Sequence, residues 1–318
     1  MRILILGAGG VGGYFGARLA AAGVDVSFLV RPGRAAQLAR DGLVVLSPMG
    51  NLRLQVTTVT EAQPGFAAVL LACKAYDLDS AIDAVAPAVT ADTLVLPLLN
   101  GMRQLNILDA RFAAERVVGG LCQIGVTLTE KGEVQHLNTV QQFAFGPRLP
   151  LQLERCERLY TTLARGGFDP VLSEDIVQRM WEKFVLLTAY AGMTCLMRAP
   201  VGAIVAADEG DALMHEILAE CAAVATACGH APGPVFLAET LAVLTQRGSP
   251  GTASMLRDIQ RGARTEHEHI LGDMLRRARQ AQIAAPLLRV ANAHLQAYEF
   301  ERARLRTEKM AKGVGPSP

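Results

Sequence analysis

The sequence has few charged residues and almost no excess charge of either sign. Charged side chains make up 19% of the 318 residues, and the formal net charge is +1. So small a charge offers no electrostatic attraction to nucleic acid or to an anionic membrane surface. Hydrophobic residues make up 51% of the chain, which excludes a largely disordered protein. We therefore expect a folded protein whose partner is a small molecule.

Targeting segments and membrane-spanning runs are also missing from the pattern. The uncharged stretch from Phe184 to Met197 is too short to cross a bilayer. The chain starts at once with a strand-like run and shows no charged segment followed by a cleavage site. These features predict a cytoplasmic protein.

Cysteine is scarce and unclustered. No two cysteines form a C-x-x-C pair, and none combines with histidines at a metal-ligand spacing. We therefore expect no bound zinc or other metal, and reduced, mostly buried thiols. The six cysteines are Cys73, Cys122, Cys156, Cys195, Cys221 and Cys228.

A glycine-rich segment near the N-terminus carries the clearest functional signal. An apolar run at 2–6 leads into Gly7, Ala8, Gly9, Gly10, Val11 and Gly12, and a helix-like stretch and a second apolar run at 24–30 follow. Glycines at the G-x-G-x-x-G positions between a strand and a helix predict a dinucleotide site. Gly7 allows the tight turn, Gly9 lets the backbone approach a pyrophosphate, and Gly12 allows close packing. The alternative is a glycine-rich turn in a non-binding α/β domain.

The end of the second apolar run refines the predicted cofactor. NAD-binding proteins usually place an acid there, which bonds the ribose 2′-hydroxyl. This chain has Arg31 instead, with Arg34 three residues later. Because a guanidinium suits a phosphate, we expect NADP(H) as the cofactor.

The chain length and the order of segments predict two domains. Residues 1–170 alternate strand-like and helix-like segments, including a hairpin at 43–46 and 52–56, and predict an α/β Rossmann-type NADP-binding domain. Residues 171–318 predict an all-α substrate and catalytic domain, with a frayed end at 313–318. The cleft between two such domains is the expected site. The expected helices of this second half are 174–198, 208–228, 234–246, 252–281 and 285–308.

Two further polar residues follow predicted buried strands, where ligands of open α/β sheets bind. Lys74 ends the apolar run 67–73 and is either a ligand of a cofactor phosphate or ribose, or a solvated lysine. Asn100 ends the run 93–99 and either presents its amide to the nicotinamide ribose or substrate, or forms a turn with Gly101.

Lys183 opens a helical segment without further charge until Arg198. A helix that is apolar all round is buried, and burial lowers the pKa of a lysine toward the range that is useful for proton donation. The alternative is a lysine that packs its stem and keeps its ammonium in water.

Glu266 interrupts an apolar stripe on the expected helix 252–281. A carboxylate in such a stripe is costly unless it is paired. This suggests either a substrate-facing group or a buried pair with an arginine, such as Arg264 or one near the C-terminus. Ser254 lies at the edge of the stripe. The stripe consists of Met255, Ile259, Ala263, Ile270 and Met274.

Several of these segments together resemble the ketopantoate reductase (2-dehydropantoate 2-reductase) family, from residue 1 to about 308. The matching pieces are GAGGVG, Arg31, Cys-Lys-Ala-Tyr at 73–76, Asn-Gly-Met at 100–102, Trp-Glu-Lys at 181–183, Ala-Ser-Met-Leu-Arg-Asp-Ile at 253–259, and Arg-Thr-Glu at 264–266 followed by Leu-Arg-Arg-Ala-Arg. The resemblance implies a helical domain like that of 6-phosphogluconate dehydrogenase. It also implies NADPH-dependent reduction of a 2-oxo acid in pantothenate biosynthesis.

The resemblance also implies a role for each candidate residue. Lys183 would be the general acid, and Glu266 would bind the distal hydroxyl of the substrate and organise the lysine. Ser254 would hold the substrate carboxylate, and Asn100 would bridge cofactor and substrate. Arg31 and Lys74 would hold the 2′-phosphate.

The chain departs from the family at two positions that follow the lysine. The family usually has asparagines one and two helical turns on, and this chain has Leu187 and Ala191. The alternatives to ketopantoate reduction are therefore a paralogous reductase of a more apolar 2-oxo acid, or a non-catalytic NADPH-sensing regulator. The Ala-, Leu- and Met-rich helical half is compatible with a homodimer.

Overall fold

The computed structural model describes residues 1–311, so the expected fraying of residues 313–318 lies outside the described residues. The chain divides into two compact units, Met1–Met180 and a second one that starts at Trp181. The division falls inside helix α6 (Ile176–Met197), whereas the boundary that we place at residue 170 stays a prediction. Within residues 1–311, no helix combines the length and the hydropathy that a membrane span requires.

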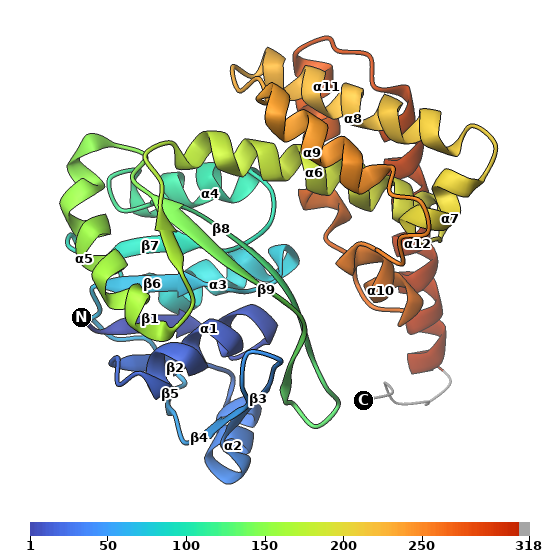
Figure 1. The fold of residues 1–318 in the computed structure, drawn as a ribbon. Coiled ribbons are helices and arrows are strands. Elements are labelled where there is room, and N and C mark those ends of the chain that lie inside the picture. The colour runs from blue at the N-terminus through green and yellow to red at the C-terminus, as the bar shows by residue number, and fades with distance from the viewer. Residues whose placement is uncertain (312–318) are drawn as a thin grey trace. The chain divides into compact units, whose positions relative to one another are not determined.

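A parallel five-stranded sheet forms the centre of the first unit (Figure 1). The three strands β1, β6 and β7 are continuous apolar runs, as is typical of parallel strands covered on both faces. This confirms the predicted Rossmann-type α/β domain. The strand order is β5 (Thr57–Val59), β2 (Val26–Leu29), β1 (Ile3–Leu6), β6 (Ala68–Leu71) and β7 (Leu94–Pro97).

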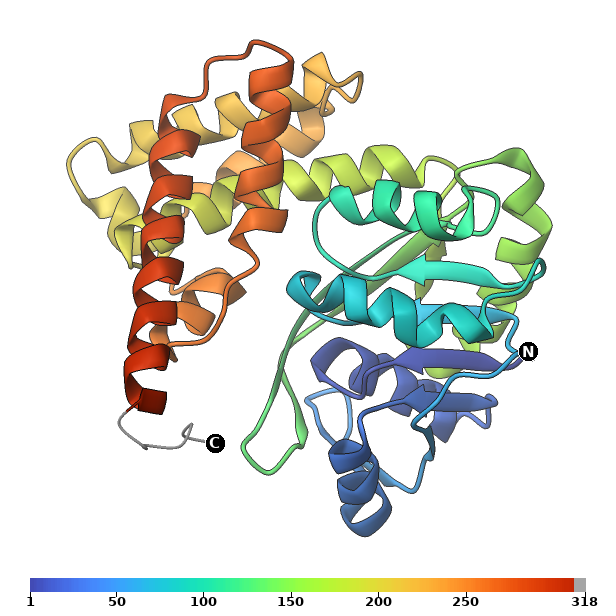
Figure 2. The ribbon, with the colours of Figure 1, turned by 180° about the vertical axis from the view of Figure 1, so that it is seen from behind.

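Helices connect these strands. Helix α1 (Gly10–Ala21) follows β1 directly and contacts both the parallel sheet and a second sheet. Helix α2 (Pro32–Asp41) follows β2, while α3 (Leu78–Val85) and α4 (Arg103–Phe112) face the viewer in Figure 2. Short 3-10 turns at Ala75–Asp77 and Ala86–Ala88 flank α3.

The second sheet differs from the sequence-based prediction. The hairpin β3 (Leu43–Leu46) and β4 (Leu52–Leu54) forms as expected, but it pairs with β9 rather than with the parallel sheet. The apolar segments of the next region predict four short strands, at 117–121, 124–128, 134–136 and 142–145. The structure instead has two long ones, β8 (Gly119–Leu128) and β9 (Val134–Gly146). Gln123 of β8 lies opposite Gln142 of β9, so these polar residues continue the strands instead of ending them. The β8–β9 pair (the β8–β9 arm) is antiparallel, and β10 (Pro170–Leu172) pairs with β9.

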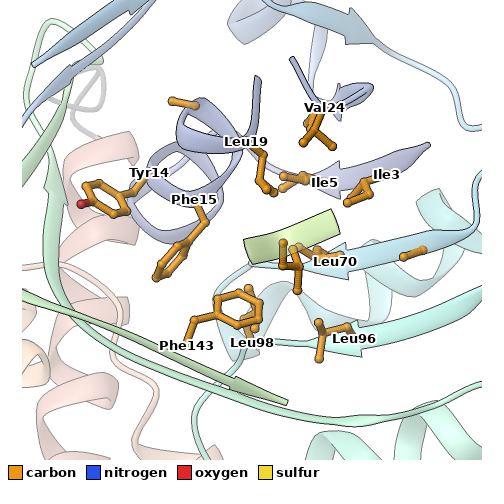
Figure 3. Packing of buried hydrophobic residues seen from close by; sticks show 14 of the residues in the cluster. Ile3, Ile5, Tyr14, Phe15, Leu19, Val24, Leu70, Leu96, Leu98 and Phe143 are labelled. Carbon is orange, nitrogen blue, oxygen red and sulfur yellow. The ribbon is translucent and has the colours of Figure 1, made fainter. Parts of the chain in front are cut away.

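Aromatic side chains join α1 to the second sheet (Figure 3). Phe15 of α1 packs edge-on against Phe143 of β9, with ring centroids 5.0 Å apart, and against Phe168 at 4.8 Å. These rings are almost fully buried and continue the core formed by Ile5 and Leu70. Helix α5 (Leu153–Leu163) completes this unit.

The second unit is all-helical, as predicted. Helices α8, α11 and α12 contact one another, and Figure 2 shows α11 and α12 side by side. Besides the rest of α6, the unit contains α7 (Val201–Ala206), α8 (Gly210–Ala227), α9 (Pro234–Leu244), α10 (Ser254–Gln260), α11 (Leu271–Gln280) and α12 (Pro286–Ala311).

The expected single helix over 252–281 is wrong. Helix α10 ends in a Schellman motif, in which the N–H of Gly262 bonds to Ile259 O at 3.0 Å and the N–H of Ala263 to Asp258 O at 2.8 Å. Gly262 has a φ of +67°, which a glycine adopts without strain. Glu266 therefore lies in the loop before a short 3-10 turn (His267–His269), and not on a helical stripe.

Candidate active site

The glycine-rich loop has the geometry that a pyrophosphate needs. Gly7 has a φ of +90°, and Gly9 caps α1 without any side-chain hydrogen bond to the helix amides. A Cβ on Gly12 would lie 2.3 Å from Gly7 O, so only glycine fits there. No side chain caps the first amide groups of α1, so these N–H groups can donate hydrogen bonds to an anionic dinucleotide.

Arg31 lies at the same edge of the sheet as this loop. It follows β2, which pairs in parallel with β1, and the N–H of Gly7 bonds to Leu29 O at 3.0 Å. Arg31 is exposed and is the N-cap residue of α2, with Pro32 as the first helical residue. Its position fits a group that meets the adenosine ribose side of a dinucleotide.

Arg34, three residues after Arg31, donates its hydrogen bonds to the protein itself. Its guanidinium is half-buried and donates to Ala8 O at 2.8 Å, to Gly132 O at 2.9 Å and to Gln37 Oε1 at 2.7 Å. These donors bind protein oxygens. Arg31 is therefore the better candidate of the two arginines for a phosphate.

Lys74 and Asn100 follow the neighbouring strands β6 and β7. Both side chains are half-buried. Because β1, β6 and β7 are parallel neighbours, their carboxyl ends share one edge with the glycine-rich loop. Gly101, with a φ of +95°, completes the turn after Asn100. Sequence reasoning missed the fully buried Gln104, whose amide donates to Gly101 O at 2.6 Å and fixes this turn.

In the second unit, Lys183 lies on a half-buried stripe of α6. Leu187, one turn later, is also half-buried, and Ala191, two turns later, is buried. The two residues before Lys183 hold this turn of the helix in place. Trp181 stacks on His230 with centroids 5.2 Å apart, and Glu182 accepts the N–H of Gly233 at 3.2 Å.

Glu266 is buried, with 9% of its surface exposed, although it is not on a helix. Helix α12 holds the part of the loop that precedes Glu266. The hydroxyl of Tyr298 donates to Ala263 O at 2.8 Å, and Oε1 of Glu299 accepts the N–H of Thr265 at 2.7 Å and its hydroxyl at 2.8 Å. Sequence reasoning missed both α12 residues, because their partners lie more than thirty residues away.

Two titratable side chains beside the Glu266 loop, Glu299 and His267, have shifted pKa values. Burial favours a raised pKa for Glu299, but the hydrogen bonds from Thr265 and the guanidinium of Arg302, 2.9 Å away, outweigh it and lower the pKa. Burial lowers the pKa of His267, and nearby Glu299 offsets this only in part. Glu299 is therefore ionised and His267 neutral at pH 7.

Ser254 is the first residue of α10 and is exposed. Met255 and Ile259 of the same helix are buried, so Ser254 lies at the solvent edge of the segment.

Over the described residues 1–311, no group of three or more His, Cys, Asp or Glu side chains could hold a metal ion. Burial raises the pKa of Cys156 and of Cys195 to about 12, so neither thiol is a nucleophile at neutral pH.

These features define a Rossmann-fold oxidoreductase with a separate helical unit. Comparison with known families supports that class. The family model described as ketopantoate reductase PanE/ApbA matches residues 3–149, and the model of its C-terminal part matches residues 175–299. The chain belongs to the ketopantoate reductase family.

Three similar proteins illustrate the range of this likeness. YkpB of Bacillus subtilis (strain 168), named an uncharacterized oxidoreductase, is 36% identical over 303 residues, which cover 95% of this chain and 100% of that protein. The crystal structure of 2-dehydropantoate 2-reductase from Geobacter metallireducens GS-15 is 30% identical, with a TM-score of 0.84 over 93% of this chain and 99% of that one. D-mandelate dehydrogenase with NADH and anilino(oxo)acetate has a TM-score of 0.85 at 19% identity, over 95% and 99% of the two chains, and shares the fold.

Proposed function

We propose that this protein reduces a 2-oxo acid to a 2-hydroxy acid with NADPH, with 2-dehydropantoate as the first substrate to test and pantothenate biosynthesis as its context. The observation that carries the proposal is the family match over both units. Lys183 and the buried Glu266 both lie within the second matched range, 175–299. The glycine-rich loop and Arg31 fit a phosphorylated dinucleotide by their own geometry.

The proposed chemistry follows from the candidate side chains. NADPH, when bound, supplies the hydride that adds to C2 of the oxo acid. The carbonyl oxygen then gains negative charge, and the Lys183 ammonium gives it a proton, which completes the hydroxyl group. A cation beside that oxygen stabilises the transition state more than the ground state. Glu266 accepts a hydrogen bond from a distal substrate hydroxyl, and its loop is fixed by Tyr298 and Glu299.

The side chains next to Lys183 on α6 favour a substrate with an apolar substituent as the second candidate. Leu187 is half-buried and apolar, and neither it nor Ala191 can hydrogen-bond through its side chain. A polar substrate group at this position would lose about 0.5–1.5 kcal/mol for each missing hydrogen bond. A branched or aromatic 2-oxo acid would instead bury apolar surface against Leu187.

The substrate proposal is tested by an NADPH-oxidation screen of 2-dehydropantoate and of 2-oxo acids with aliphatic or aromatic substituents. We expect turnover of at least one of them by the wild type. Leu187→Asn is expected to improve kcat/KM for 2-dehydropantoate about tenfold relative to the most apolar acid, the effect of one added hydrogen bond. If no 2-oxo acid is reduced, the reductase assignment is wrong. If Leu187→Asn and the wild type have the same ratio of kcat/KM for 2-dehydropantoate to kcat/KM for the most apolar acid, Leu187 does not face the substrate.

Arg31→Asp is expected to reverse the cofactor preference. A carboxylate repels the 2′-phosphate of NADPH and accepts hydrogen bonds from the ribose hydroxyls of NADH. The measurement is the ratio of kcat/KM for NADPH to that for NADH, with an expected loss of about 10²-fold or more, since a charge-assisted pair is replaced by a repulsion. An unchanged ratio would show that the 2′-phosphate binds elsewhere.

A further inference from the structure

Arg34 links three segments that are far apart in the sequence. Its Nη2 donates to Ala8 O of the glycine-rich loop at 2.8 Å, and its Nη1 donates to Gly132 O at 2.9 Å and to Gln37 Oε1 at 2.7 Å. Ala8 precedes α1, Gly132 lies in the turn of the β8–β9 arm, and Gln37 is on α2. A single guanidinium therefore joins the loop, the arm and α2.

The turn of the β8–β9 arm is shaped to receive this guanidinium. The N–H of Gly132 bonds to Thr129 O at 2.9 Å, and Gly132 has a φ of +76°. A Cβ on Gly132 would lie 2.5 Å from Arg34 Nη1. Gln37 strengthens the joint, because its amide donates to Lys131 O at 2.6 Å.

The arm also packs on the glycine-rich loop through apolar side chains. A Cβ on Gly10 would lie 3.0 Å from Val126 Cγ2, and one on Gly9 would lie 3.6 Å from Leu128 Cδ1. The arm thus contacts the start of α1 through apolar side chains. The hydrogen bonds of Arg34 to Gly132 O and Ala8 O add a polar link between the turn of the arm and the same loop.

The bond to Ala8 O has a consequence for the neighbouring amide. In a trans peptide the C=O and N–H groups point to opposite sides. When Arg34 holds the carbonyl of Ala8, the N–H of Gly9 is turned away from Arg34. Gly9 is the N-cap residue of α1, so this amide is one of the groups that offer a hydrogen bond to an anion. Burial lowers the pKa of Arg34, but its guanidinium stays charged at neutral pH.

We propose that Arg34 is a positioning residue for the dinucleotide pyrophosphate, acting through the Ala8–Gly9 peptide and the β8–β9 arm. This proposal rests on the proposed dinucleotide function. It separates two neighbouring arginines: Arg31 discriminates the 2′-phosphate, whereas Arg34 sets the affinity for the part that NADPH and NADH share.

The experiment measures Kd for NADPH and for NADH from nicotinamide fluorescence, without any oxo acid. Arg34→Met keeps an unbranched apolar stem and removes the guanidinium donors. We expect it to raise both Kd values about tenfold, the effect of losing one hydrogen bond from the Gly9 amide to the charged pyrophosphate, and to leave their ratio within twofold of wild type. Arg31→Asp is expected to change the ratio. Arg40→Met is the matched control on the same helix, because Arg40 is exposed and pairs with Asp41.

Binding of 2′-AMP, which lacks a pyrophosphate, shows whether Arg34→Met is folded and keeps its 2′-phosphate site. Arg34→Met should bind it like the wild type, and Arg31→Asp should not. Both Kd values within twofold of wild type in Arg34→Met would overturn the proposal, as would loss of NADPH affinity alone, which would make Arg34 a ligand of the 2′-phosphate. Failure of the wild type to bind either dinucleotide would contradict the proposed function itself.

Discussion

Lys183→Ala is expected to lower kcat for 2-oxo-acid reduction by about 10²–10⁴-fold, the usual contribution of a general acid. Without the ammonium, the alkoxide that forms after hydride addition has neither a proton donor nor a stabilising charge. Because Lys183 lies on a half-buried stripe of α6 and not in the hydrophobic core, the loss should not come from unfolding. The measurement is steady-state NADPH oxidation with the best acid from the screen, together with Kd for NADPH, which should stay near its wild-type value.

Lys183→Arg separates proton donation from charge. Arginine keeps the positive charge but does not lose its proton at accessible pH, so kcat should stay low while KM for the oxo acid stays near its wild-type value. Arg179→Ala is the matched control, since Arg179 is exposed on the same helix one turn earlier. If Lys183→Ala kept more than about a tenth of the wild-type kcat, the general-acid role would be wrong. The result would then favour the hypothesis of a non-catalytic NADPH-sensing regulator over that of a reductase.

The part of the fold that local sequence determines was predictable. Continuous apolar runs such as 68–71 correspond to buried parallel strands, and glycines at 7, 9 and 12 mark the strand-to-helix turn. The pairing of β3 with β9 was not, because their registered residues, such as Val45 and Val134, are almost ninety positions apart. No local pattern encodes which sheet a hairpin joins.

Glu266 shows how a residue can be singled out for a reason that the structure does not support. The apolar stripe places it on a continuous helix, but the helix ends at Gln260 and Gly262 turns the chain away. An isolated glycine inside a helical pattern is tolerated or is a C-cap, and periodicity alone cannot decide between them. Glu266 is nevertheless buried, and its loop is held by Tyr298 and Glu299 of α12.

Arg34 shows that a sequence alone does not reveal the partner of a charged donor. A guanidinium next to a nucleotide-binding motif suits a phosphate, but it suits backbone carbonyls as well. Its partner Gly132 lies 98 positions away, so only the folded β8–β9 arm reveals the contact. Sequence reasoning thus found the residue types of the candidate site and could not assign each donor to its acceptor.

Gly12→Ala is expected to disable the dinucleotide site. The added Cβ would lie 2.3 Å from Gly7 O and 3.1 Å from Ile5 Cγ2, and a backbone oxygen cannot swing aside as a flexible side chain can. Relief of this clash requires the start of α1 to move by about 1 Å, a misplacement that costs about 10²-fold in kcat/KM. Overpacking of this kind also destabilises by about 1–3 kcal/mol, or roughly 5 °C in Tm. Kinetics with NADPH and a thermal melt measure the two effects.

Gly33→Ala separates the clash from the general effect of replacing a glycine. Gly33 lies in the first turn of α2, and a Cβ there would meet no atom within 4 Å. Alanine at such a site stabilises by about 0.4–1 kcal/mol, because it restricts the unfolded chain. We therefore expect an unchanged or slightly raised Tm and wild-type affinity for NADPH. If both variants kept wild-type kinetics, the close approach of α1 to Gly7 would not be what forms the dinucleotide site. If Gly12→Ala lost stability alone, the glycine would serve packing and not the cofactor.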